Sequence, residues 1–289
     1  MRPAAQPERR TIDVGGEQRG YLLCRPAAEP TGIVLSLHGR GVTARFQVSF
    51  SGMDRLATSR DAVVVFPQGS VRLDHRGMMW DPQVDVDYLG RIVNEVRTEF
   101  AGVDPRVCIA GMSNGAFMAC EFAAARPDDV AVLAAVAGVR APPTPPARPV
   151  PVVAFHGLLD RSLPYGGGAG SRLSERVIRR QNVRAGRPPG WPGAVRRQAV
   201  PDAALAWARA NGVETDRSVA DVSPTLRKTT YGEGTPGEVT LWTFADAGHA
   251  WPGRAMAAPL RLLFGHTSRE VDATEEIWRF FQHHRSEGV

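Results

Sequence analysis

Short runs of apolar residues alternate with longer stretches in which apolar positions recur at helical spacing. The runs lie at 33–37, 62–66, 107–110, 152–155 and 239–244. Short continuous apolar runs are typical of parallel strands that are buried on both faces. The pattern therefore predicts an α/β protein with a mostly parallel central sheet and helices on both faces.

Helical spacing is clearest in three segments. Apolar side chains recur at Tyr88, Ile92, Val93 and Val96, then around 116–122, and then near the end of the chain. We expect the last of these to be a helix from Asp272 to His284. At the other end, residues 20–24 follow the turn-forming pair Gly15-Gly16, which predicts an antiparallel hairpin at the start of the sheet.

One segment interrupts this alternation. From about 163 to 200 the composition shifts to Gly, Arg and Pro, with glycines at 166–168 and prolines at 188, 189 and 192. Long irregular insertions in compact domains are usually functional. We therefore expect a single domain over residues 1–289, with a cap-like lid insertion at about 163–200.

Composition excludes several classes of protein. Lys and Arg number 35 against 30 Asp and Glu, a net charge of +5. Arginines gather at 172–197 without the interleaved aromatic residues that stack on bases. We expect this stretch to be either a lid or a substrate-binding surface, and we expect no nucleic-acid partner. No apolar run approaches the roughly 18 residues that span a bilayer, so no membrane partner is expected either.

The cysteines and the N-terminal residues indicate the cellular compartment of the protein. Cys24, Cys108 and Cys120 are too few and too scattered for a disulfide framework or a zinc site, so buried free thiols and no bound metal are expected. The basic residues near Met1 are followed by no apolar segment typical of a signal peptide. These features favour a cytoplasmic protein, with an extracellular one as the alternative.

The strongest chemical signal is the pentapeptide Gly111-Met112-Ser113-Asn114-Gly115, between a predicted strand and a predicted helix. A Gly-x-Ser-x-Gly in this context is typical of a nucleophile elbow, a sharp turn that holds a serine hydroxyl clear of its own backbone. Because a serine hydroxyl is a weak nucleophile at neutral pH, Ser113 would need an adjacent base and a carboxylate that orients the base.

Two later loops supply these partners. Asp160 follows the predicted strand 152–155, and His249 follows the strand 239–244. Open α/β sheets build their sites just beyond the carboxyl ends of strands, and the order Ser113, Asp160, His249 is the order of α/β-hydrolases. Asp246 is a competing acid, but it lies three residues before His249 and less readily reaches the far ring nitrogen.

An acyl-transfer site also needs backbone N–H donors for the oxyanion of the tetrahedral intermediate. The strand 33–37 ends in His38-Gly39-Arg40-Gly41, where this fold supplies one donor, and the residue after the nucleophile supplies the other. We expect the amides of Arg40 and Asn114 to form the oxyanion hole, with His38 bracing the loop.

Taken in order, these blocks resemble the esterase family of the α/β-hydrolase superfamily that includes polyhydroxybutyrate depolymerases and feruloyl or acetylxylan esterases. The blocks that carry the resemblance are Leu37–Gly41, Gly111–Gly115, Phe155-His156-Gly157 with Asp160, and Gly248–Gly253. The resemblance implies Ser113 as nucleophile, Asp160 as acid and His249 as base. The chain departs from it at Val213, where relatives often have cysteine. Because the predicted final helix nearly closes the chain, we expect no added polymer-binding module.

The sequence therefore predicts a serine esterase without cofactor or metal that acts on small or oligomeric esters of the feruloyl, acetyl or hydroxyalkanoate type. Trp251, Tyr165 and Trp80 are candidate walls of its substrate pocket. A serine peptidase of the prolyl oligopeptidase type, with the same order of residues, is the alternative enzyme. A non-catalytic binding protein on the same scaffold is the third possibility.

Overall fold

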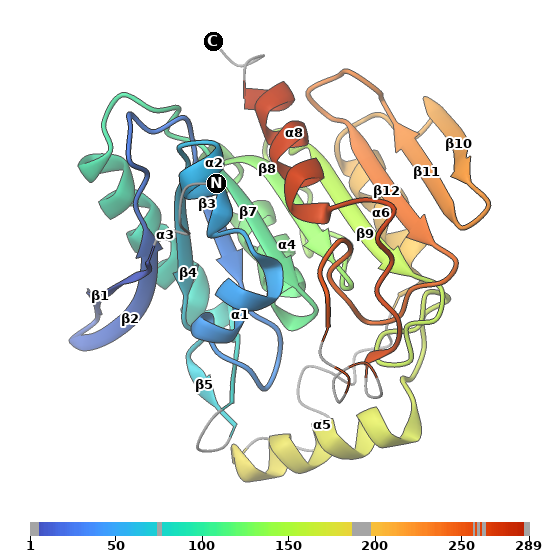
Figure 1. Ribbon diagram of the computed structural model, residues 1–289, viewed down its shortest axis with the longest axis horizontal. Helices are drawn as coiled ribbons and strands as arrows, with labels where there is room; N and C mark the ends of the chain where they lie inside the picture. Colours follow the sequence, from blue (N-terminus) through green and yellow to red (C-terminus); the bar gives the residue numbers. More distant parts are fainter. Residues whose placement is uncertain are drawn as a thin grey trace.

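A computed structural model describes residues 6–73, 77–186, 198–256, 258, 261 and 264–285. One large sheet contains β1 (Glu8–Val14), β2 (Glu17–Cys24), β3 (Ile33–Leu37), β4 (Val63–Pro67), β7 (Val107–Met112), β8 (Val130–Val136), β9 (Val152–Gly157), β10 (Arg217–Ser223), β11 (Leu226–Tyr231) and β12 (Val239–Phe244). Their order in space is β1-β2-β4-β3-β7-β8-β9-β12-β11-β10 (Figure 1). A separate short hairpin joins β5 (Val71–Arg72) to β6 (Met78–Met79).

The middle of the sheet is parallel and both of its edges are antiparallel. The strands from β4 to β12 in the spatial order run parallel, whereas β1, β2, β10 and β11 pair antiparallel. The central strands are buried on both faces because apolar side chains occupy successive positions. In β3, for example, Val34 packs into one core cluster and Leu35 into the other. This confirms the predicted sheet.

Helices cover both faces of the sheet. Those within the described residues are α1 (Ala44–Ser51), α2 (Arg55–Ser59), α3 (Pro82–Glu99), α4 (Asn114–Ala125), α5 (Arg172–Arg184), α6 (Val200–Ala210) and α8 (Ala273–Arg285), with a 3₁₀ turn at Pro127–Asp129. The core on one face includes residues of α3, α4 and α6, and the core on the other face includes residues of α1, α2 and α8. The helix α5 instead lies beyond the carboxyl ends of the central strands (Figure 1).

The predicted elements at 33–37, 62–66, 107–110, 152–155 and 239–244 are strands, and the N-terminal hairpin and final helix are also present. Three strands of the large sheet, β8, β10 and β11, were not predicted, nor was the short hairpin of β5 and β6. The alanine-rich run of β8 has no strand-specific pattern, and β10 is an edge strand whose side chains are nearly all exposed. Neither carries the alternation that a half-buried strand shows.

The segment expected to be an irregular insertion contains a regular helix, α5. Ser171 caps its N-terminus by accepting a hydrogen bond from Ser174 N. The part of the insertion at 187–197 lies outside the described residues. All three cysteines are buried thiols. Within the described part of the chain, no helix is long and apolar enough to cross a membrane.

Candidate active site

Ser113 lies in a tight turn between β7 and α4. Its backbone has φ 55° and ψ −117°, a region that residues with a side chain rarely adopt. The turn is held by a hydrogen bond from Ser113 N to Val136 O, and the first helical bond runs from Phe117 N to Ser113 O. This is the strained strand-to-helix turn that the pentapeptide predicts.

The two glycines of the pentapeptide are required by close packing. A Cβ on Gly111 would lie 2.3 Å from the carbonyl oxygen of Gly115, and a Cβ on Gly115 would lie 2.5 Å from the carbonyl oxygens of Leu37 and His38. Strand β7, helix α4 and the loop after β3 therefore meet here with no room for a side chain.

We expect Gly115→Ala to destabilise the protein, because backbone atoms on both sides must move to admit the methyl group. The expected loss is about 1–3 kcal/mol in the free energy of unfolding, measured by urea denaturation. Gly166→Ala is the matched control, since its Cβ would meet nothing within 4 Å. Equal stability of the two variants would contradict the packing argument.

Asp160 and His249 are brought together although 89 residues separate them. Asp160 follows β9 and His249 follows β12, and these two strands are parallel neighbours in the sheet. The Nδ1 atom of His249 lies 2.7 Å from Oδ2 of Asp160. Both side chains are buried, at 5% and 4% exposure. A buried contact of this kind fixes the orientation of the imidazole.

The other oxygen of Asp160 is held by its own loop. Oδ1 accepts hydrogen bonds from Ser162 N and Leu163 N, both at 2.8 Å. Burial by itself would raise the pKa of Asp160, but His249, together with His156 and the hydrogen bond from Leu163 N, outweighs it and brings the pKa below its ordinary value. The carboxylate is therefore ionised at neutral pH.

The competing acid, Asp246, lies elsewhere. Its carboxylate faces His266, with 3.6 Å between Oδ2 and Nε2. A residue that the sequence analysis gave no separate role, His156, lies beside Asp160 instead, with its Nε2 atom 3.4 Å from Oδ2 and donating to the carbonyl oxygen of Leu163 at 2.8 Å. Burial lowers the pKa of His156, so its neutral ring ties β9 to the loop that carries Asp160.

The loop after β3 lies against the elbow. A Cβ built on Gly39 would be 3.8 Å from Cβ of Ser113. His38 is fully buried and braces the loop: burial lowers its pKa to about 4, its Nδ1 donates to Gly39 O, and its Nε2 accepts from Gly69 N. Of the two loop glycines, only Gly41 has a positive φ, 79°. This is the bracing role expected for His38.

Trp80 links the two segments expected to supply oxyanion donors. Its indole N–H donates to His38 O at 2.8 Å, and its backbone N–H donates to the side-chain oxygen of Asn114 at 2.9 Å. The Asn114 amide precedes the first helical hydrogen bond of α4, a position where backbone N–H groups have no partner within the helix. The geometry is compatible with the predicted pair of donors, Arg40 N and Asn114 N.

A cavity of about 390 Å³ contains both Ser113 and His249 in its wall. Most of the remaining wall is apolar and comes mainly from α1, α5 and the segment around Phe264, with contributions from the end of β7 and the loops after β3 and β9. The apolar side chains are Val42, Phe46, Phe50, Met112, Leu163, Leu173, Val177, Ile178 and Phe264. Phe264 also stands 5.8 Å from the His249 ring, centroid to centroid.

The aromatic residues predicted as pocket walls do not line this cavity. Trp251 is fully buried, and its N–H donates to Thr274 Oγ1. Trp80 is also buried, and Tyr165 packs on the edge of His156 with its hydroxyl 3.0 Å from that of Thr243. These three are packing residues, because their polar atoms find partners inside the fold. The sequence does contain a pattern that points to the observed cavity wall. Phe46 and Phe50 form an i, i+4 pair shortly after the loop that follows β3.

Helix α5 is anchored to the site by Arg40. The guanidinium donates to Gln181 Oε1 at 2.8 Å, to Asn182 Oδ1 at 2.5 Å, and to the sulfur of Met79 at 3.1 Å. These acceptors are neutral, and burial lowers the pKa of Arg40 to about 10, so it remains protonated at neutral pH. Arg40 therefore holds the apolar face of α5 over the cavity.

We expect Arg40→Met to loosen α5, because the substitution keeps the buried stem and removes hydrogen bonds worth about 1 kcal/mol each. Trypsin should then cut after the exposed arginines of α5 at least about tenfold faster, as read by mass spectrometry. The matched control is Arg45→Met, at an exposed position of α1. Unchanged cleavage in Arg40→Met would show that other contacts anchor the helix.

Comparison with known proteins gives two relatives in sequence. A protein named "Putative esterase NocK" from Nocardia uniformis subsp. tsuyamanensis is 29% identical over 290 residues, which cover 92% of this chain and 80% of that protein. "Bifunctional acetylxylan esterase/xylanase XynS20E" from Neocallimastix patriciarum is 29% identical over 136 residues, 46% of this chain and 20% of that protein. No model of a protein family matches the chain.

A solved structure shares the fold. The acetyl xylan esterase from Aspergillus awamori superposes with a TM-score of 0.57 at 14% sequence identity, covering 84% of this chain and 94% of that one. With the sheet order and the strand-to-helix turn at Ser113, this confirms the predicted α/β-hydrolase fold. The two sequence relatives, both named as esterases, confirm the resemblance to esterases.

Proposed function

We propose that this esterase-type α/β-hydrolase cleaves carboxylic esters with Ser113 as nucleophile, His249 as general base and acid, and Asp160 as the acid of the triad. Ser113 Oγ attacks the ester carbonyl while the imidazole of His249 takes its proton. His249 then gives this proton to the alcohol as the ester bond breaks. The alcohol departs and the acyl group stays bound to Ser113. A water molecule, activated by His249 in the same way, then attacks this acyl-enzyme and releases the carboxylic acid.

Asp160 supports the charge that the imidazole acquires. Its carboxylate accepts from His249 Nδ1, so the ring is held with Nε2 as the basic atom, and its negative charge stabilises the imidazolium. The amides of Arg40 and Asn114 are proposed to bind the oxyanion of the tetrahedral intermediates. One such donor typically contributes about 3–4 kcal/mol to transition-state stabilisation.

The observation that carries this proposal is the buried contact between His249 and Asp160, with His249 and the strained Ser113 both in the wall of one cavity. A chain that only bound ligands would have no need to orient a buried imidazole with a carboxylate beside a strained serine. The esterase names of the two sequence relatives point the same way.

The cavity bears on the substrate. Its walls are largely apolar, and no acidic side chain lies among the described residues that line it. Such a pocket suits a small or oligomeric ester with an apolar acyl or aromatic group, and we propose the feruloyl, acetyl and hydroxyalkanoate classes as candidates. We further propose that residues 163–200 are the lid of a single domain, since Leu173, Val177 and Ile178 of α5 form one side of the cavity.

The test is whether the chain forms an acyl-enzyme at Ser113. We expect p-nitrophenyl acetate and butyrate to give a burst of p-nitrophenolate close to one equivalent, and a phosphonate ester probe to label the peptide that contains Ser113, as read by mass spectrometry. Cleavage of aminoacyl nitroanilides without cleavage of esters would instead favour the peptidase. Absence of both activities and of labelling would refute the proposal.

A further inference from the structure

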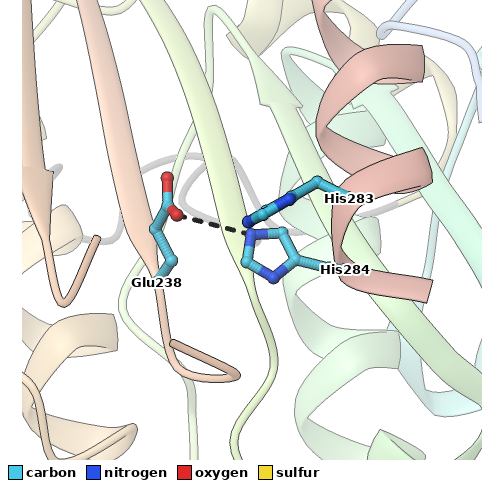
Figure 2. A group of neighbouring side chains, drawn as sticks. All are labelled: Glu238, His283 and His284. Atoms are coloured by element: carbon cyan, nitrogen blue, oxygen red, sulfur yellow. Dashed lines mark ion pairs between the residues drawn. The ribbon is translucent and has the colours of Figure 1, made fainter. Parts of the chain in front are cut away.

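Three side chains with metal-binding atoms meet near the amino-terminal end of β12, whereas the proposed active site lies at the carboxyl ends of the strands. Glu238 directly precedes β12, while His283 and His284 belong to the last turn of α8 (Figure 2). One ligand atom from each residue lies within 4.8 Å of the others. The closest approach between Glu238 and His284, from Oε2 to Nε2, is 3.6 Å.

Two members of this cluster are buried and held in place. Glu238 is 5% exposed and His284 is 4% exposed. The Glu238 carboxylate is oriented by its own segment: Gly234 N donates to Oε2 at 2.9 Å, and the Thr240 hydroxyl donates to Oε1 at 2.8 Å. His284 packs on Phe280 with 4.4 Å between ring centroids. These contacts fix two ligand atoms before any ion binds.

The third member can adjust. His283 is exposed, and its ring stands edge-on to that of His284, with centroids 4.8 Å apart. Successive residues of a helix ordinarily point in different directions, yet here both imidazoles reach the side of α8 that faces Glu238 (Figure 2). Bonds of about 2.0–2.2 Å place tetrahedral ligand atoms about 3.4 Å apart, so a small rotation of His283 would close the site.

The charge around the cluster tolerates a cation. His284 also lines a cavity of about 140 Å³ that includes Arg106 and Arg148. Each arginine faces an aspartate, Arg106 at 3.2 Å from Asp104 and Arg148 at 3.9 Å from Asp128. Their charges are therefore partly compensated, and the Glu238 carboxylate lies within ion-pair distance of His284.

We propose that Glu238, His283 and His284 bind one divalent transition-metal ion, with Zn²⁺ as the best match. Two imidazoles and a carboxylate are a donor set that zinc uses, and they leave one position for water. Hard cations such as Mg²⁺ prefer oxygen ligands and are not expected to bind. The ion would join the end of α8 to the start of β12. It lies at the opposite end of β12 from His249, so its effect is on stability and not on the proposed ester chemistry.

The test uses the full chain without a polyhistidine tag, stripped with chelator. We expect calorimetric titration with Zn²⁺ to give one site, Co²⁺ to give the visible absorption of a nitrogen- and oxygen-ligated ion, and Mg²⁺ to give nothing. Zn²⁺ at about 100-fold above Kd should raise Tm by about 5 °C or more, because the ion binds only the folded state.

The decisive variant is His283→Ala, since this side chain is exposed and its removal should leave the fold intact. It should bind Zn²⁺ at least about tenfold more weakly and lose the Tm increase. His266→Ala, at another exposed histidine, is the matched control and should bind as the parent does. The proposal is overturned if the parent chain binds no Zn²⁺, if His283→Ala binds it equally well, or if His266→Ala removes the binding.

Discussion

Ser113→Ala is expected to lower kcat for p-nitrophenyl butyrate by about 10⁶-fold, the loss typical of removing the nucleophile of a serine hydrolase. Alanine has no hydroxyl to attack the carbonyl, and His249 would then have no proton to accept. The backbone at this position is already strained at φ 55°. Because serine and alanine tolerate that conformation about equally, Tm should change little.

The control for this prediction is Ser174→Ala. Ser174 also lines the cavity, from α5, and its hydroxyl makes a long hydrogen bond of 3.4 Å to the Ser162 hydroxyl. We expect its removal to leave kcat within about twofold of the parent value, since its hydroxyl takes part in no step of the proposed reaction and the loss of one long hydrogen bond has a small effect. If Ser113→Ala kept parental activity, or if Ser174→Ala lost activity to the same extent, Ser113 would not be the nucleophile.

Asp160→Asn is expected to reduce kcat by about 10⁴-fold, as for the corresponding change in other triads. The asparagine oxygen could still accept from Ser162 N and Leu163 N, so the loop should keep its shape. Its amide N–H₂ would then face His249 Nδ1 and force the ring proton onto Nε2. In that tautomer the imidazole cannot take the proton of Ser113.

Asp246→Asn separates the two acids that the sequence left as candidates. Asp246 lies against His266 and not against His249, so this variant should retain nearly all of the parental kcat. Measuring kcat for both variants at neutral pH, where the lowered pKa of Asp160 keeps it ionised in the parent chain, makes the comparison direct. A larger loss in Asp246→Asn than in Asp160→Asn would reverse the assignment.

Much of the proposed site could be predicted because its signals are local. The strand-to-helix turn needs glycines on both sides of Ser113, and a sequence displays glycines directly. Asp160 and His249 each follow an apolar run, and parallel strands bring their carboxyl ends to one edge of a sheet. The order of the strands in space was not needed for this inference, since any parallel arrangement gathers those loops at the same edge.

The walls of the cavity could not be predicted in the same way. Trp251 and Trp80 were predicted as pocket walls because large aromatic side chains often line pockets. A tryptophan can equally be buried in the core when its indole N–H donates a hydrogen bond there. Which of these occurs depends on a neighbour distant in sequence, such as Thr274 for Trp251. The contribution of α5 could not be predicted for a related reason. Its few apolar residues lie among arginines, and only the tertiary structure shows that they line the same cavity as Phe46 and Phe50.

The sequence by itself determined the α/β architecture, the turn at Ser113 and the loops that carry Asp160 and His249, because apolar periodicity and glycine placement act over a few residues. Only the tertiary structure decided that His249 meets Asp160 and not Asp246, that Arg40 anchors α5, and that Glu238 faces His283 and His284. Those pairings join segments far apart along the chain. They follow from the order in which strands and helices pack, which no local pattern encodes.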